Sequence, residues 1–320
     1  MEVLRAQVSF WESRAFGLYW TKPLLPSLWY LSTGFYVDSR PEEMRWIDHT
    51  SISTRLSIGR RVAPHTRVFL GVIPYYEILN VHSRNADSTV STRNVDFTEL
   101  FTNLSTGTDF RNARYDARSG WAFYSTFSTN AVHHDIVTPY YQFTGDFRFY
   151  IPSVFKDHKV ATRLQLQMRD KQTGIYHALA YGGEITSLRG YARSLFPLNI
   201  SIRDAALVST EYRFPIWRFE PMRIPLLSRF SRVFNAIEFR LDGAAIFDYG
   251  RMAPSLKDLT SLDGTIESGL GIGGGLRVMV PTLQKSAVID VVWGEDPRTG
   301  RGSVEFLRKP AIYLYVDLHY

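Results

Sequence analysis

The 320-residue chain contains no cysteine, and this absence removes several classes of protein at once. Without thiols there is no disulfide framework, no cysteine-ligated zinc cluster and no thiol nucleophile. No apolar run approaches the roughly 18 residues that a membrane-spanning helix needs, so a helical membrane protein is excluded. The first ten residues also lack the apolar core of a secretory signal. We therefore expect a cytosolic chain, a mature or trimmed form, or the tail of a longer protein.

Lysine is scarce while arginine and aromatic residues are abundant. The 37 basic residues comprise 30 Arg and 7 Lys, the net charge is +6, and aromatic residues make up 14% of the chain. An arginine excess suits nucleic acid, a pore lining or an anionic lipid headgroup. Because the arginines are dispersed along the chain rather than clustered, the pattern argues against nucleic acid as a partner.

Hydrophobic and polar residues alternate with a period of two, which is typical of strands rather than helices. Residues 162–169 place Leu164 and Met168 on one face, and Arg163 and Arg169 on the other. The same alternation runs through residues 141–151 and 237–249. A soluble β-sandwich or barrel also alternates in this way. Segments of about ten residues with charged polar faces favour a transmembrane β-barrel, apolar toward lipid and polar toward the lumen.

The fold class predicted is all-β: an antiparallel transmembrane β-barrel of about 14 to 16 strands, forming one domain over residues 1–320. Candidate strands lie at 3–12, 15–22, 27–38, 49–61, 65–79, 95–109, 119–130, 136–151, 159–169, 204–217, 233–249, 265–280, 286–294 and 311–320. Short turns alternate with longer polar segments, as in outer-membrane barrels. Aromatic side chains are expected to form interfacial girdles: Trp20, Trp29, Tyr30, Tyr75, Tyr76, Tyr140, Trp217 and Trp293.

The last segment alternates Leu314, Val316, Leu318 and Tyr320 against polar or aromatic neighbours, and it ends on the aromatic Tyr320. Such an ending resembles the C-terminal assembly signal of bacterial outer-membrane proteins. An ordinary strand that happens to end the chain is the alternative.

The most specific motif lies in the long segment at about 170–203. It consists of Gly182 and Gly183 followed by Leu188, Arg189, Gly190 and Tyr191. It resembles the Gly-Gly and Val/Leu-Arg-Gly-Phe/Tyr signature of the BamA-type, bacterial surface antigen superfamily of outer-membrane barrels. Further elements of that family are matched in order: the strand at 207–216, the Phe-x-Asp-x-Gly-like strand at 245–250, the glycine-rich strand at 268–281 and the aromatic-ended last strand.

Two carboxylates on polar strand faces are candidate partners of this motif. Glu211 lies opposite Tyr212 and Phe214 in the alternation, and Asp248 lies on the polar face of its own strand, so both point into the predicted lumen. The resemblance implies that the 170–203 loop folds into the lumen, with Arg189 at its tip and Glu211 and Asp248 as its wall partners. Such a triad either props a plug in place or takes part directly in transport.

The resemblance implies insertion or translocation of proteins at the outer membrane of a Gram-negative bacterium, without enzymatic chemistry or cofactors. Implied partners are outer-membrane lipids, the assembly machinery, and unfolded client polypeptides or partner subunits. The family usually has sixteen strands preceded by periplasmic repeats, whereas this chain offers about fourteen strands and no such repeats. The first one or two strands, which form the family's lateral seam, are the ones that lack a counterpart here.

Two other functions remain open. The barrel is either a passive or gated pore, or the membrane anchor of a larger protein. In the pore hypothesis inward arginines favour anions: Arg189, Arg163, Arg169, Arg148, Arg213 and Arg240.

No metal site is predicted, because His133, His134 and Asp135 fall in an expected polar turn with no further ligand at useful spacing. The glycines at 269–275 only superficially resemble a phosphate-binding loop, and they are expected to make room for lumenal contents.

Overall fold

The computed structural model describes most strands and short joins of the chain, and thirteen segments are covered. They are residues 3–9, 14–24, 28–40, 47–84, 90–113, 116–130, 139–171, 188–191, 203–223, 236–261, 267–281, 285–295 and 308–316.

The described residues form one antiparallel sheet of 14 strands, in which each strand pairs with its neighbours in sequence. The strands are β1 (Val3–Ser9), β2 (Arg14–Leu24), β3 (Trp29–Arg40), β4 (Ile47–Ala63), β5 (Thr66–Arg84), β6 (Val90–Asp109), β7 (Gly120–Asn130), β8 (Tyr141–Pro152), β9 (Lys159–Arg169), β10 (Asp204–Arg218), β11 (Arg240–Ala253), β12 (Glu267–Val280), β13 (Lys285–Gly294) and β14 (Ala311–Val316). A short helix, α2 (Leu256–Thr260), follows β11. In this part of the chain no helix is long and apolar enough to cross a membrane.

The all-β class and the fourteen strands predicted from the alternation are confirmed. The bounds of β9 coincide with the predicted 159–169. The largest difference is at β11, which begins at Arg240 rather than at 233; before it, Ile237 makes only an isolated bridge to Met222. Residues 317–320, which include Leu318 and Tyr320 of the predicted assembly signal, lie outside the described residues.

Each strand separates a polar face from an apolar face, because successive side chains point to opposite sides. On β4, Ser51, Ser53 and Ser57 are buried, whereas Ile52 and Leu56 between them are exposed. We call the face with the buried polar residues the inner face and the one with exposed apolar residues the outer face. This arrangement is the reverse of a soluble protein and suits a wall whose outside meets lipid.

The girdle prediction was wrong for three of the tyrosines. Trp29 and Tyr76 lie exposed on the outer face, but their chain neighbours Tyr30 and Tyr75 must then point inward. Tyr140 is also an inner residue, and it is buried under the guanidinium of Arg169, 5.0 Å from the ring centre. Alternation therefore assigns adjacent aromatic residues to opposite faces, so aromatic content alone does not mark a lipid interface.

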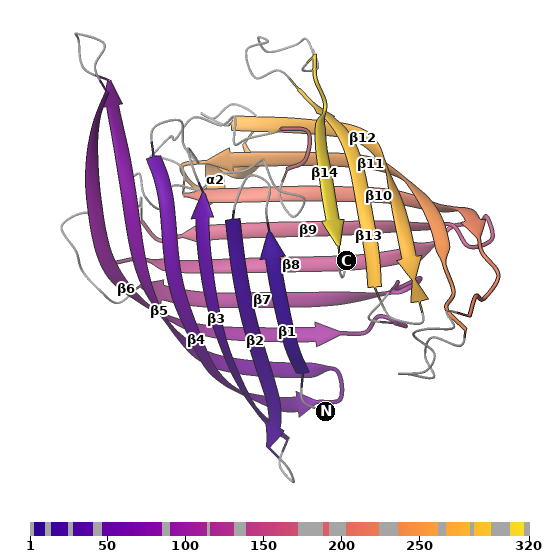
Figure 1. Ribbon diagram of the computed structural model, residues 1–320, viewed down its shortest axis with the longest axis horizontal. Coiled ribbons are helices and arrows are strands. Elements are labelled where there is room, and N and C mark those ends of the chain that lie inside the picture. The colour runs from indigo at the N-terminus through magenta and orange to yellow at the C-terminus, as the bar shows by residue number, and fades with distance from the viewer. Residues whose placement is uncertain are drawn as a thin grey trace.

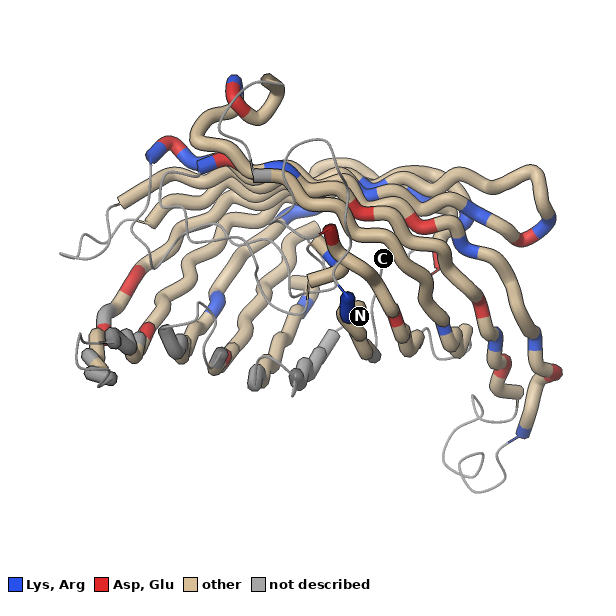
Figure 2. Tube along the Cα trace, turned by 90° about the horizontal axis from the view of Figure 1, so that it is seen from above, with Lys and Arg blue, Asp and Glu red and all other residues tan. Residues whose placement is uncertain are grey.

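The sheet curls so that its first and last strands come to the same side of the molecule (Figure 1). Seen from above it forms an arch, with basic and acidic positions intermixed along its strands (Figure 2). Within the described residues β1 pairs only with β2, and β14 pairs only with β13, so the two outermost edges are not joined to each other.

Candidate functional site

The centre of the candidate site is Arg189, whose side chain is fully buried against the inner face of β10, β11 and β13. It binds Asp248 of β11 with two parallel hydrogen bonds, from Nε to Oδ2 at 2.7 Å and from Nη2 to Oδ1 at 2.8 Å. The backbone N–H of Arg189 also donates to Asp248 Oδ2 at 3.2 Å. A planar guanidinium suits this paired geometry, which a lysine ammonium cannot reproduce.

The remaining donors of Arg189 bind two further strands. Nη1 donates to Glu211 Oε1 of β10 at 2.6 Å and to Asp290 Oδ2 of β13 at 3.1 Å, and Nη2 donates to Ser209 Oγ at 2.8 Å. The side chain of Arg189 therefore uses each of its N–H groups, and it joins three strands through one residue.

Two wall arginines complete the charge balance of this cluster. Arg277 of β12 bonds Asp290 and Glu211, the latter from Nη2 at 3.0 Å, and Arg213 donates to Glu211 Oε2 at 2.8 Å. Three arginines thus face three carboxylates, and all six side chains are buried. Burying an unbalanced charge is costly, so this matching is required for the cluster to form at all. We call the set of Arg189, Arg213, Arg277, Glu211, Asp248 and Asp290 the arginine cluster.

Glycines let the Leu188–Tyr191 segment lie directly on the wall. Gly190 has a φ of 107°, and a Cβ there would lie 2.7 Å from the backbone nitrogen of Gly294. At Gly271 a Cβ would collide with the carbonyl oxygen of Arg189. The left-handed conformation and the close backbone approach both require glycine. The glycine-rich β12 therefore provides the space that the segment occupies.

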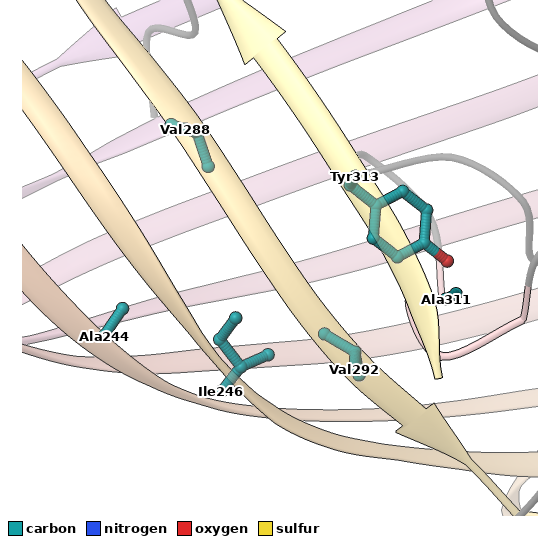
Figure 3. Close-up of a cluster of buried hydrophobic side chains, with 6 residues drawn as sticks. All are labelled: Ala244, Ile246, Val288, Val292, Ala311 and Tyr313. Carbon is teal, nitrogen blue, oxygen red and sulfur yellow. The ribbon is translucent and has the colours of Figure 1, made fainter. Parts of the chain in front are cut away.

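The segment is also held at β14. The Tyr313 hydroxyl accepts from the Gly190 N–H at 3.1 Å and donates to the Tyr191 carbonyl at 2.8 Å. Tyr313 belongs to a buried apolar cluster on β11, β13 and β14 (Figure 3) that comprises Ala244, Ile246, Val288, Val292, Ala311 and Tyr313. Four residues thus contact every strand from β10 to β14.

The structure brings together most of the residues singled out in the sequence. All four residues of the Leu188–Tyr191 segment are buried. Arg189 contacts both Glu211 and Asp248. Gly182 and Gly183 lie outside the described residues, as do His133, His134 and Asp135. Leu314 is exposed on the outer face, and nothing is described of the Val316 side chain.

Sequence reasoning missed Asp290, Arg277, Ser209 and Tyr313 as members of the site. Asp290 carried a usable signal, because it is the one charged residue within the apolar run 287–293 of strand β13. The signal for Arg277 was weaker, since inward arginines are common in this chain. In the part of the chain that the structure describes, no group of three or more His, Asp or Glu residues is placed to hold a metal ion.

A second polar cluster lies in the β6–β7 and β8–β9 connections. We call it the turn clasp, and it comprises Asp116, Arg118, Asp157, Lys159, Arg218 and Arg240. Asp116, in the β6–β7 connection, bonds Lys159 of β9 and Arg240 of β11, the latter at 2.6 Å. Asp157, in the β8–β9 turn, bonds Arg118 at 2.8 Å and Arg218 at 2.5 Å. Both aspartates have positive φ angles, 53° and 65°, a strained conformation that surrounding contacts must hold.

Asp116 is ionised despite its burial. Burial is the largest single influence and raises its pKa, but the adjacent charges of Lys159 and Arg240 together outweigh it, so the pKa is lowered. The carboxylate form of Asp116 is therefore the one that links β9 to β11.

An antiparallel sheet with an apolar outer face, a polar inner face and a segment inserted against its inner wall is typical of a transmembrane β-barrel. Comparison with known proteins gives the family: the Omp85 superfamily domain matches residues 3–288, and the chain belongs to that superfamily. Its fold is similar to that of BamA from Haemophilus ducreyi lacking POTRA domains 1-3, with a TM-score of 0.65 and 14% sequence identity. The match covers 96% of this chain and 62% of the BamA chain. No curated protein sequence gave a significant match.

The chain is thus an outer-membrane barrel of the Omp85 superfamily with a BamA-like fold, in agreement with the motif resemblance. It spans 62% of the length of the BamA chain to which it is similar.

Proposed function

We propose that this barrel takes part in inserting or translocating proteins at the outer membrane of a Gram-negative bacterium, and that it does so without enzymatic chemistry. Membership of the Omp85 superfamily supports this role. The observation that carries the proposal is the pair of strand edges at β1 and β14, which have no strand partner among the described residues although all thirteen neighbouring pairs are formed.

The physical basis is strand addition. An open edge presents a row of backbone N–H and C=O groups, which bind an extended segment of another chain through ordinary sheet hydrogen bonds. Within the described residues, β1 contributes 7 residues and β14 contributes 6 to these edges, so each edge offers a row of backbone groups to a client strand. An unfolded client would pair with this edge while local thinning of the bilayer lowers its barrier to insertion.

In this proposal the arginine cluster acts as a fixed support. Arg189 connects β10, β11 and β13, while Tyr313 attaches the same segment to β14 next to the open edge. The last strand is therefore anchored from inside while its outer edge stays available. Arg189, Glu211 and Asp248 then serve as positioning residues, and direct contact with a client is not needed for their effect.

The test is insertion of an unfolded client barrel protein into proteoliposomes that contain this chain. We expect faster client folding than in empty liposomes of the same composition, and an equal rate would overturn the insertase role for this chain. Because the protein has no cysteine, a bismaleimide added to the double variant Ala6→Cys with Leu314→Cys reacts only at these two positions on the edge strands, and the cross-linked product is isolated before the assay. This cross-link across the seam should abolish the acceleration. A cross-link between the paired positions Thr33→Cys and Leu56→Cys should not.

Anion conduction is less favoured by the contacts of the inner face. Five of the six arginines expected to attract anions bind carboxylates, because Arg148 and Arg163 share Asp146, Arg240 binds Asp116 and Asp242, and Arg189 and Arg213 belong to the arginine cluster. The sixth, Arg169, bonds Gln142 and stacks on Tyr140. Single-channel recording of Arg189→Ala tests whether the Leu188–Tyr191 segment seals the lumen. A large new conductance would support this sealing role, and unchanged low conductance would reject it.

Service as the anchor of a larger protein is the remaining alternative. The 62% coverage of the BamA chain leaves room for it. Sequencing the full gene around this chain decides between an attached enzyme domain and the repeats typical of the family.

A further inference from the structure

The outer face carries two basic residues at one end of β2–β4, where an apolar wall is expected throughout. This end is opposite the one at which the long 170–203 segment joins β9 to β10, and here β4 joins β5 through residues 64–65 and β8 joins β9 through residues 153–158. Lys22 of β2 and Arg60 of β4 are the charged residues among the outward side chains that the structure describes on β2, β3 and β4. Both are exposed.

Each of these cations lies over the ring of a tryptophan. The guanidinium carbon of Arg60 is 5.4 Å from the ring centre of Trp29, its direct partner in the β3–β4 register. Lys22 Nζ is 5.9 Å from the ring centre of Trp20, two residues back on the same strand. Cation–π contact fixes the direction of the Arg60 guanidinium without using its N–H donors.

The surroundings place these cations at the boundary between lipid and water. Leu24 is the register partner of Trp29 on β2, and Leu24, Leu28 and Val62 are all exposed around Arg60. A basic residue on the lipid face is tolerated at the interface and costs about 2–4 kcal/mol at the bilayer midplane. At the interface the fixed anions are the phosphates of lipid headgroups, which attract basic residues.

The patch is local, because other strands end differently at the same end of the wall. On β8 and β9 the outward register pair nearest the short turn is Ile151 and Val160, both apolar. Next to Arg60, the outward residue of β5 is Val68. A general need for basic residues at the end of every strand therefore does not explain Lys22 and Arg60.

We propose that Trp20, Lys22, Trp29 and Arg60 form a binding site for the phosphate of an anionic phospholipid headgroup. Short turns face the periplasm in outer-membrane barrels, so the lipid belongs to the periplasmic leaflet. Arg60 binds the phosphate oxygens through two N–H groups, Lys22 adds a second positive charge, and the two indoles contact the glycerol and upper acyl region. This site rests on the outer-membrane location of the barrel and is independent of the insertase proposal.

The test compares retention of phosphatidylglycerol with that of phosphatidylcholine by native mass spectrometry, after extraction from nanodiscs that contain equal amounts of both lipids. The test variant is Lys22→Gln with Arg60→Gln. The control, Lys257→Gln with Arg308→Gln, makes the same charge change at exposed residues elsewhere. We expect the test variant to lose the phosphatidylglycerol preference about tenfold or more, and the control to keep it.

Three outcomes would overturn the site. An equal loss in the control would mean that net charge alone sets the preference. Undiminished phosphatidylglycerol retention in the test variant would show that Lys22 and Arg60 do not bind the lipid. Displacement of the lipid by millimolar soluble glycerol phosphate would show a free-phosphate site rather than a lipid site. Heat-shifted mobility of each variant on SDS gels verifies that the barrel is folded before lipid is counted.

Discussion

The wall from β2 to β7 and the wall from β9 to β14 are joined internally in different ways. In the first, side-chain hydroxyls pair between neighbouring strands, as at Thr21 and Ser32, 3.1 Å apart, and at Ser105 and Thr126, also 3.1 Å apart. In the second, Arg189 contacts three strands at once and adds a segment that belongs to none of them. The second wall also has a hydroxyl pair, at Thr162 and Thr210, and the turn clasp between β9 and β11. The contact that distinguishes it is Arg189, which joins three strands through one residue.

This difference determines how each wall responds to damage. A hydroxyl pair between adjacent strands adds about 0.5–1 kcal/mol to pairing that the backbone already maintains. Removal of Arg189 takes both side-chain bonds from the buried Asp248 carboxylate and one bond each from Glu211 and Asp290, so buried charges on three strands lose contacts together. The β9–β14 wall is therefore expected to be rigid and sensitive to substitution, whereas the β2–β7 wall is more tolerant.

Arg189→Ala is expected to have the largest effect. Asp248 loses both side-chain hydrogen bonds from Arg189, while Glu211 and Asp290 lose one each. Breaking a buried ion pair on one side costs about 3–5 kcal/mol, so the urea midpoint of unfolding in lipid vesicles should fall clearly. Arg189→Lys should recover only part of the loss, because an ammonium cannot form the paired bonds to Asp248.

Arg67→Ala is the matched control in the other wall, where Arg67 stacks over Tyr30 at 5.1 Å. Its loss should lower stability by about 1 kcal/mol. Equal losses for Arg67→Ala and Arg189→Ala would break the comparison between the two walls.

Gly275→Ala is expected to have the next largest effect, and it tests whether the arginine cluster needs the space that glycine leaves on β12. A Cβ at Gly275 would lie 2.6 Å from Nη1 of Arg277 and 2.8 Å from the carbonyl oxygen of Ile289. We expect about 2–3 kcal/mol of destabilisation from overpacking, measured by the same unfolding assay. The adjacent Gly274 faces outward, and its Cβ would meet only the Ala244 carbonyl at 3.4 Å, so Gly274→Ala should be neutral. A neutral Gly275→Ala would show that the cluster rearranges easily.

The turn clasp should respond to acid. Because the pKa of Asp116 is lowered in the folded barrel, its contribution is complete above the unfolded pKa of about 3.9 and is lost as the pH falls through the folded value. Asp116→Asn should cost about 1–2 kcal/mol at pH 7 and flatten the acid loss of stability. Asp96→Asn, at an exposed position on β6, is the control. A wild-type acid profile in Asp116→Asn would show that the clasp does not contribute.

Most of the fold could be predicted from the alternation of apolar and polar residues. The alternation assigns each residue to one face of its strand, because a shift of one residue would exchange the two faces. It located all fourteen strands and placed Asp248 opposite Phe247 and Tyr249. The prediction of interfacial aromatic residues failed where it used residue type instead of position in the strand. Tyr30 and Tyr75 point inward, as the alternation requires, although tyrosine is common at the lipid interface.

The site was less accessible from sequence. A short motif drew attention to Arg189, and face assignment supplied Glu211 and Asp248. Asp290 and Tyr313 meet that segment only because β13 and β14 curl around it, more than 100 residues further along the chain. Such contacts depend on the curvature of the sheet, which the period of two does not encode.

The smallest predicted effect concerns the hydroxyl pair of Ser105 and Thr126. Ser105→Ala, Thr126→Val and the double variant form a cycle, and we expect a coupling of only about 0.5 kcal/mol because each strand stays paired through its backbone. The same cycle for Arg189→Ala and Asp248→Asn should give several times more. A coupling at Ser105–Thr126 as large as at Arg189–Asp248 would mean that the first wall is also held by a connected network.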